Sequence, residues 1–180
     1  MYKKVWFNGY TALCTFIIFM IFLIVILPNE AQKSDALGLM TSPDTSFFYT
    51  KQTLYEIAHA YGFIGRSFYI KQRFTFDLVW PLVYGSFLFI NSVYLYQKNQ
   101  FSKYRILLLL PLVAVVFDYL ENIMASIVMY RYPSETMIVA DLAGFMTALK
   151  WLSLSLSFII IVVLFSMALL RFVRNKMMHR

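Results

Sequence analysis

The stretch ILLLLPLVAVVFDYLENIMASIVMY, which runs from Ile106 to Tyr130, decides the fold of this chain. It is longer than the roughly 20 apolar residues that a helix needs to cross the hydrocarbon core of a bilayer. Inside it lie two carboxylic acids, Asp118 and Glu121, and the amide of Asn122. An ionisable group at membrane depth costs about 2.5 kcal/mol or more, so such groups are rare there and usually functional. The stretch therefore predicts a membrane helix that carries a polar site.

The composition indicates a membrane protein. Of the 180 residues, 61% are hydrophobic and only 14% are charged, which excludes an ordinary water-soluble domain. A chain of this length allows a single membrane domain, residues 1–180. The formal net charge is +7, but the basic residues flank apolar segments and form no patch with aromatic residues, so we expect no nucleic-acid partner. The only cysteine, Cys14, cannot form a disulfide within the chain.

Four windows are long and apolar enough to span a bilayer, at about residues 10–27, 74–96, 106–130 and 139–170. The first window resembles a signal peptide, because lysines precede it. It is long for that role, and the residues after it make a poor cleavage site, so we interpret it as an uncleaved anchor. The expected fold is all-α: a polytopic, four-transmembrane-helix bundle in the cell membrane.

Charge predicts the orientation. With the N-terminus in the cytoplasm, the inner segments hold basic residues and no acid, and all nine acids fall outside or within the spans. These inner basic residues are Lys3, Lys4, Lys98, Lys103, Arg105, Arg171, Arg174, Lys176 and Arg180. Cytoplasmic loops carry an excess of Lys and Arg, so the pattern predicts that both termini are cytoplasmic.

A long outer loop, residues 28–73, joins the first two spans. It opens with turn-forming residues up to Thr45. A short helix then follows at about residues 51–61, because Thr50 suits an N-cap and Gly62 suits the position just after a helix. The apolar residues of this helix share one face, so we expect an extracytoplasmic amphipathic helix that lies on the surface or caps the bundle.

Each of the three later spans carries a polar face, because residues three, four and seven apart share a side of a helix. On the third span this face holds Asp118, Glu121 and Asn122, and on the second it holds Asp77 and Tyr84. The fourth span has a ridge of small residues that allows close packing. The ridge is formed by Ala140, Gly144 and Ala148; Asp141, Thr147 and Trp151 lie along its edges, and Lys150 lies further round.

Depth places two of these groups at one level. At about 1.5 Å of rise per residue, Glu121 and Lys150 each lie roughly 13 Å below the outer boundary. A buried pair between them would reduce the cost of both charges. We therefore expect a polar cavity in the outer half of the bundle, open toward the extracytoplasmic side.

The candidate site follows from these faces. In a catalytic version, one of Asp118 and Glu121 stays protonated as general acid and the other acts as base. The expected ligand-binding residues are Asp77, Tyr84, Asn122, Asp141, Thr147, Lys150, Trp151 and Arg66. Simpler interpretations stay open: the third-span polar groups could join helices by hydrogen bonds, and Asp77 and Arg66 could only mark the membrane interface. The sequence indicates no metal site and no cofactor, because no acid-rich helix carries a suitably spaced histidine.

Several motifs carry a resemblance. They are Tyr61-Gly62-x-x-Gly65-Arg66, Asp77-Leu78-x-x-Pro81-x-x-Tyr84-Gly85, Phe117-Asp118-Tyr119-x-Glu121-Asn122 and Lys150-Trp151. From about residue 50 onward the chain resembles a family of small bacterial four-span membrane proteins of unknown function. In span count, length and membrane acids it is also similar to the EXPERA group, which includes sterol isomerases and a sterol-binding receptor. That likeness is one of topology, so no catalytic role transfers.

The sequence favours a protein that binds, and in one version converts, a lipid or other apolar small molecule in an intramembrane cavity. One alternative is an accessory, immunity or assembly subunit of a membrane complex. Another is a proton- or cation-coupled transporter, which would need a homo-oligomer because four spans without inverted repeats are too few. Whether the chain is an enzyme stays open.

Overall fold

The computed structural model describes residues 7–39, 42–100 and 103–178, and every regular element within these ranges is a helix. The helices are α1 (Gly9–Ile21), α2 (Leu27–Asp35), α3 (Lys51–Arg73), α4 (Phe76–Lys98), α5 (Leu110–Arg131) and α6 (Met137–Met178). Short 3₁₀ turns lie at Pro43–Thr45 and Arg105–Leu109. The predicted all-α class is therefore confirmed.

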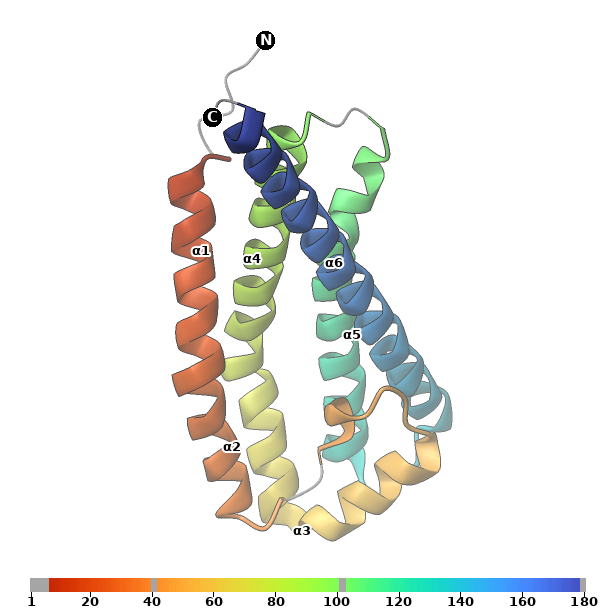
Figure 1. Ribbon diagram of the computed structural model, residues 1–180. Coiled ribbons are helices and arrows are strands. Elements are labelled where there is room, and N and C mark those ends of the chain that lie inside the picture. The colour runs from red at the N-terminus through yellow and green to blue at the C-terminus, as the bar shows by residue number, and fades with distance from the viewer. Residues whose placement is uncertain (1–6, 40–41, 101–102, 179–180) are drawn as a thin grey trace.

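Four stretches are long and apolar enough to cross a membrane: Gly9–Asp35, Lys51–Lys98, Arg105–Arg131 and Met137–Met178. The long helices run side by side along the bundle, whereas α3 lies across one end of it, which we call the α3 end (Figure 1). The start of α1 and the end of α6 both lie at the opposite end (Figure 1).

The first helix is longer than predicted. It was expected to stop at residue 27, with a loop from Pro28, but α2 continues the helix to Asp35. A π turn, Phe22–Ile26, joins α1 to α2, and the N–H of Leu27 bonds the carbonyl of Phe22 five residues earlier. Proline disturbs a regular helix because it lacks an N–H and its ring meets the preceding turn. The wider turn directly before Pro28 lets the helix pass this residue.

The helix after Thr50 also extends beyond its predicted end. The Thr50 hydroxyl accepts from the N–H of Thr53, as expected of an N-cap, and Gly62 has a positive φ of 58°. Helical structure resumes after this kink and continues to Arg73, where we expected a loop. Gly65, Tyr69 and Arg73 are buried at intervals of four, so the second half of α3 has its own packed face. At the other end of the chain, α6 likewise runs on to Met178, past the expected end at residue 170.

In the core of the bundle, a polar region lies between two apolar clusters. At the α3 end, Leu54 and Ala58 of α3 pack with Val128 of α5 and Ala143 of α6. Further along the bundle, Phe19, Phe87, Leu88, Ala114 and Val115 form a second cluster between α1, α4 and α5. α5 and α6 form the most extensive helix pair, whereas α1 packs mainly against α4. The buried polar residues of α5 lie between these two clusters.

A connecting segment passes into the bundle at the α3 end. This segment, residues 42–50, includes Pro43, which is fully buried, and Tyr49, which is 3% exposed. It crosses α6 at Gly144, where a Cβ atom would lie only 1.9 Å from the carbonyl oxygen of Tyr49. The predicted small-residue ridge therefore allows close packing, and at Gly144 its neighbour is this segment.

We expect Gly144→Ala to destabilise the protein by about 1–3 kcal/mol, because the added methyl group must displace the backbone at Tyr49. Thermal unfolding in detergent micelles measures the effect. Ser155→Ala, an exposed position on the same helix, is the control and should leave the unfolding temperature unchanged. Equal stability of Gly144→Ala and wild type would contradict the close approach.

Candidate functional site

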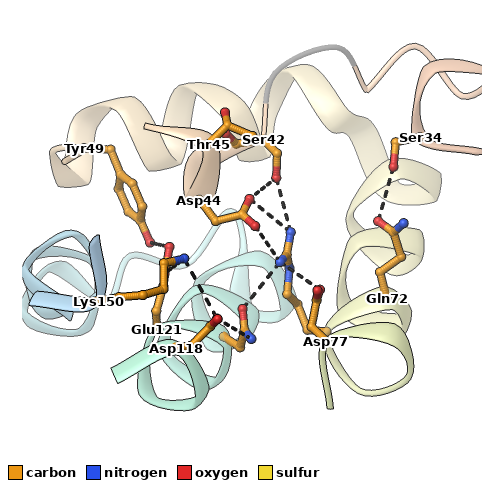
Figure 2. Close-up of polar contacts among 12 residues, drawn as sticks. Ser34, Ser42, Asp44, Thr45, Tyr49, Gln72, Asp77, Asp118, Glu121 and Lys150 are labelled. Carbon is orange, nitrogen blue, oxygen red and sulfur yellow. Dashed lines mark hydrogen bonds and ion pairs between the residues drawn. The ribbon is translucent and has the colours of Figure 1, made fainter. Parts of the chain in front are cut away.

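Lys150 and Glu121 form an ion pair inside the bundle. The Nζ atom of Lys150 lies 2.5 Å from Oε2 of Glu121, and their residues are 4% and 0% exposed. This confirms the pair that helix depth predicted. The Tyr49 hydroxyl donates to the other oxygen of Glu121 at 3.4 Å (Figure 2). Glu121 is thus held from α6 and from the connecting segment.

Asp118 lies one helical turn away on the same face of α5. The Tyr84 hydroxyl donates to its Oδ2 at 2.7 Å, and the Asn122 amide donates to its Oδ1 at 3.2 Å. Lys150 Nζ is 3.9 Å from the same Oδ1. Three helices therefore contribute to the surroundings of one carboxylate, which fixes the position of both of its oxygens.

A second ionic group is centred on Arg73, at the end of α3. Its guanidinium contacts both oxygens of Asp44, at 2.8 and 3.2 Å, and lies 2.8 Å from Asp77 Oδ2. It also donates to the side-chain oxygen Oδ1 of Asn122 at 3.4 Å. Because Asn122 bonds to both Arg73 and Asp118, it connects the two ionic groups into one network.

Sequence reasoning missed Asp44 and the role of Arg73. Arg73 and Asp77 are four residues apart, a spacing that suits a direct pair, whereas from the sequence we expected Asp77 to bind a ligand or only to mark the membrane interface. Asp44 gives no local signal, because it lies in a turn-rich segment and meets its partner only through the tertiary fold. The Asp44 carbonyl accepts from the Trp151 indole at 3.2 Å, so the segment is attached to α6 as well.

Asp44 is held in its charged form. Burial favours the neutral acid, but the Arg73 guanidinium, the Lys150 ammonium and the Ser42 hydroxyl outweigh burial and hold the pKa of Asp44 well below its ordinary value. A carboxyl group whose pKa is lowered by folding stabilises the folded state when the pH is above its ordinary pKa. This stabilisation is lost as the pH falls below that value. The Asp44–Arg73 pair therefore holds the connecting segment at neutral pH.

A cavity of about 410 Å³ opens beside this network. We call it the polar cavity, and its polar lining includes Asp44, Thr45, Asp77, Tyr84, Asp118, Lys150 and Trp151. Its remaining wall is mainly apolar, with Phe19 and Leu23 on the α1 side and Leu154 and Phe158 on the α6 side. The polar cavity thus joins ionisable groups to an apolar surface within one space.

Five predicted ligand residues line this cavity: Asp77, Tyr84, Lys150, Trp151 and, from the predicted catalytic pair, Asp118. Glu121 and Asn122 belong to the network, and Thr147 is buried beside it, but none of the three is part of the cavity wall. Glu121 therefore lies where it can position Lys150 but cannot meet a ligand in the cavity.

Two predicted ligand residues lie elsewhere. Asp141 is half exposed and pairs with Lys51 at 3.1 Å, beyond the network. Arg66 donates to the Ala58 carbonyl at 2.9 Å and stacks over the Tyr132 ring. Arg66 lies just after the Gly62 kink, where its side chain reaches back to the free carbonyls of the preceding helix. Both residues therefore lie outside the polar cavity, and their role in ligand binding stays a prediction.

The chemistry of the network follows from its charges. Four carboxylates, those of Asp44, Asp77, Asp118 and Glu121, accompany two cations, so the fully ionised network would carry a net charge of −2 (four minus two). Inside a membrane bundle such an imbalance is relieved by protons or by a cationic group.

Comparisons with family models, with curated proteins and with solved structures find no match to this chain. The geometry of the polar cavity is therefore the basis for the function proposed below.

We expect Lys150→Met to destabilise the protein by about 3–5 kcal/mol, because Glu121 would remain enclosed without its partner. The double variant Lys150→Met/Glu121→Gln removes both charges and should recover much of the loss. Thermal unfolding in micelles measures both variants. A double variant as unstable as the single one would show that Lys150 acts through packing instead of charge.

The stability difference between wild type and Asp44→Asn should depend on pH. Since the pKa of Asp44 is lowered in the folded state, the difference should be largest at neutral pH and should shrink as pH falls below about 4. Asp141→Asn is the control, because its pair is exposed and worth little. Unfolding in micelles from about pH 6 to about pH 3 tests this, and a constant difference would contradict the role of the Asp44 charge.

Proposed function

We propose that this chain is an integral protein of the cell membrane that binds a lipid or another apolar small molecule in the polar cavity. The polar cavity is the observation that carries the proposal, because it offers both an apolar wall and ionisable groups. Binding sites for small molecules typically combine a mostly apolar lining with a few fixed polar groups. Here the ion pairs fix those groups before any ligand arrives.

We further propose that the α3 end faces the extracytoplasmic side and that both termini are cytoplasmic. The distribution of Lys and Arg supports this orientation, since Lys98, Arg105 and Arg171 lie near the opposite end of the bundle. A hollow of about 340 Å³ at the α3 end shares Asp44, Asp77 and Trp80 with the polar cavity. This continuity supports an opening of the cavity toward that side.

A second candidate function, conversion of the bound molecule, is favoured by the two α4 and α5 carboxyls in the cavity wall. Asp118 and Asp77 both line it, and the Tyr84 hydroxyl holds Asp118 in place. In this version Asp118 exchanges a proton with the ligand, Asp77 is the second carboxyl, and Glu121 acts through Lys150. The role that the sequence suggested for Glu121 as an acid or base thus passes to Asp77.

Mass spectrometry of the gently purified protein tests binding. We expect wild type to retain a defined small molecule, and Leu154→Trp to lose it, because the indole would fill the apolar side of the cavity. Leu152→Trp is the matched control, since Leu152 lies on the same helix, is 49% exposed and does not line the cavity. Equal retention in both variants, or none in wild type, would contradict the proposal.

Further measurements separate the other functions. Conversion predicts that Asp118→Asn retains a different chemical species from wild type, because the unreacted substrate accumulates; chromatography with mass spectrometry distinguishes the two species even where their masses are equal. An accessory subunit predicts a co-purified protein and no small molecule. A transporter predicts an oligomer that carries protons or cations across proteoliposomes. The resemblance to small bacterial four-span proteins stays a prediction beside these.

A further inference from the structure

A second cavity lies in the same helix groove as the polar cavity, nearer the opposite end of the bundle. It measures about 460 Å³, and α1, α4 and α6 form its walls. Its lining is apolar except for a few groups such as Asn91, whose amide is already bonded to the Ala12 carbonyl and the Thr15 hydroxyl of α1. We call it the apolar cavity. Tyr94 is the one ionisable side chain in the lining as the structure describes it.

On each of α1, α4 and α6, the residues that line the two cavities lie on one continuous face of the helix. On α6, Leu154 and Phe158 line the polar cavity, and Ile161 and Phe165 line the apolar cavity. These residues follow one another at steps of three or four, which is the spacing of a single helix face. The same face of α6 therefore passes from one cavity into the other.

α4 and α1 repeat this arrangement. On α4 the step from Tyr84 to Phe87 leads from the polar to the apolar cavity, and on α1 the step from Phe19 to Phe16 does so. The Phe87 ring stacks on Phe19 with centroids 4.4 Å apart and lies 5.9 Å from Phe16. Three aromatic rings thus lie between the two cavities. We call the groove that contains both cavities and these rings the trench; it runs along the bundle axis.

The trench is open toward the lipid on one side. α1 packs against α4, but α1 and α6 form no substantial packed pair in the described part of the chain. Side chains on the two rims are exposed: Leu13 is 56% exposed on α1, and Val162 is 59% exposed on α6. A hydrocarbon chain could therefore enter the trench sideways from the bilayer.

We propose that the ligand of the polar cavity is a lipid with a long, flexible hydrocarbon chain, and that this chain lies in the apolar cavity. This inference rests on the proposed binding function. On α4, Tyr84 lines the polar cavity and Leu95 lines the apolar cavity. The two residues are eleven positions apart in the sequence, which is about 16 Å of helix. One acyl chain spans half of the roughly 30 Å hydrocarbon core, about 15 Å. A flexible chain can also pass over the three phenylalanine rings, whereas a rigid ring system needs one broad cavity.

Photo-crosslinking in lipid nanodiscs tests this proposal. The probes are two 1-monoacylglycerols with chains of sixteen and eight carbons, each with a diazirine at the chain end. Mass spectrometry maps the labelled peptides, and an excess of unlabelled probe defines specific labelling. The long probe should label the apolar cavity on α1 and α6, and the short probe should label only the polar cavity.

Val162→Trp should reduce specific labelling of the apolar cavity by the long probe at least fivefold, because the indole fills the cavity. Val163→Trp is the matched control, since Val163 is the next residue on the same helix, is 50% exposed and lines neither cavity. Leu13→Trp repeats the test from the α1 rim. Undiminished labelling by the short probe in each variant shows that the fold and the polar cavity are intact.

The outcomes separate the two proposals. Equal labelling by the long probe in Val162→Trp and Val163→Trp would overturn the chain assignment, while specific labelling by the short probe would still support binding in the polar cavity. Absence of specific labelling by both probes in wild type would overturn the binding function together with the chain assignment.

Discussion

The structure depends on the matching of charges inside a bundle of low polarity. Glu121 is fully enclosed, and it is tolerable there because Lys150 reaches it from the neighbouring helix at 2.5 Å. Arg73 does the same for Asp44 and Asp77. A buried ion pair adds little net stability compared with apolar residues, but removal of one partner is costly. The network therefore constrains which helices must lie together more than it adds to stability.

The ion pairs also explain why one wall of the polar cavity is polar and the other apolar. The two cations draw α3, the connecting segment and α6 toward the acids of α4 and α5. Among the residues that the structure describes, no comparable pair attaches α1, which meets α4 through stacked aromatic rings and the Asn91 amide. The cavity consequently has a rigid polar wall on one side and an apolar wall on the other, and it is the apolar side that borders the lipid.

Much of this architecture could be predicted from the sequence. Hydrophobic length placed all four spans, and helical spacing placed Asp118, Glu121 and Asn122 on a buried face of α5. Depth along the helices predicted the Lys150–Glu121 pair. These predictions succeeded because they use only the rise and period of a helix, which tertiary contacts do not alter.

The remaining features depend on contacts between distant segments. The continuation of the first helix past Pro28 required a π turn, which no local pattern signals. Asp44 reaches the network because its segment is drawn between the helices, so its neighbours in sequence gave no indication. Asp141 and Arg66 were predicted to bind a ligand, but their contacts in the structure lie outside the polar cavity.

The order of the charges along the chain has a consequence for biogenesis. Asp118 and Glu121 lie on α5, whereas their cation lies on α6, which a ribosome completes later. Chains emerge and assemble from the N-terminus onward. The acids of α5 thus reach the translocation machinery before Lys150 does, and they become compensated only when α6 arrives beside them. The last two helices are accordingly expected to enter the bilayer as a joined hairpin, so that their extensive contact forms during insertion and not after it.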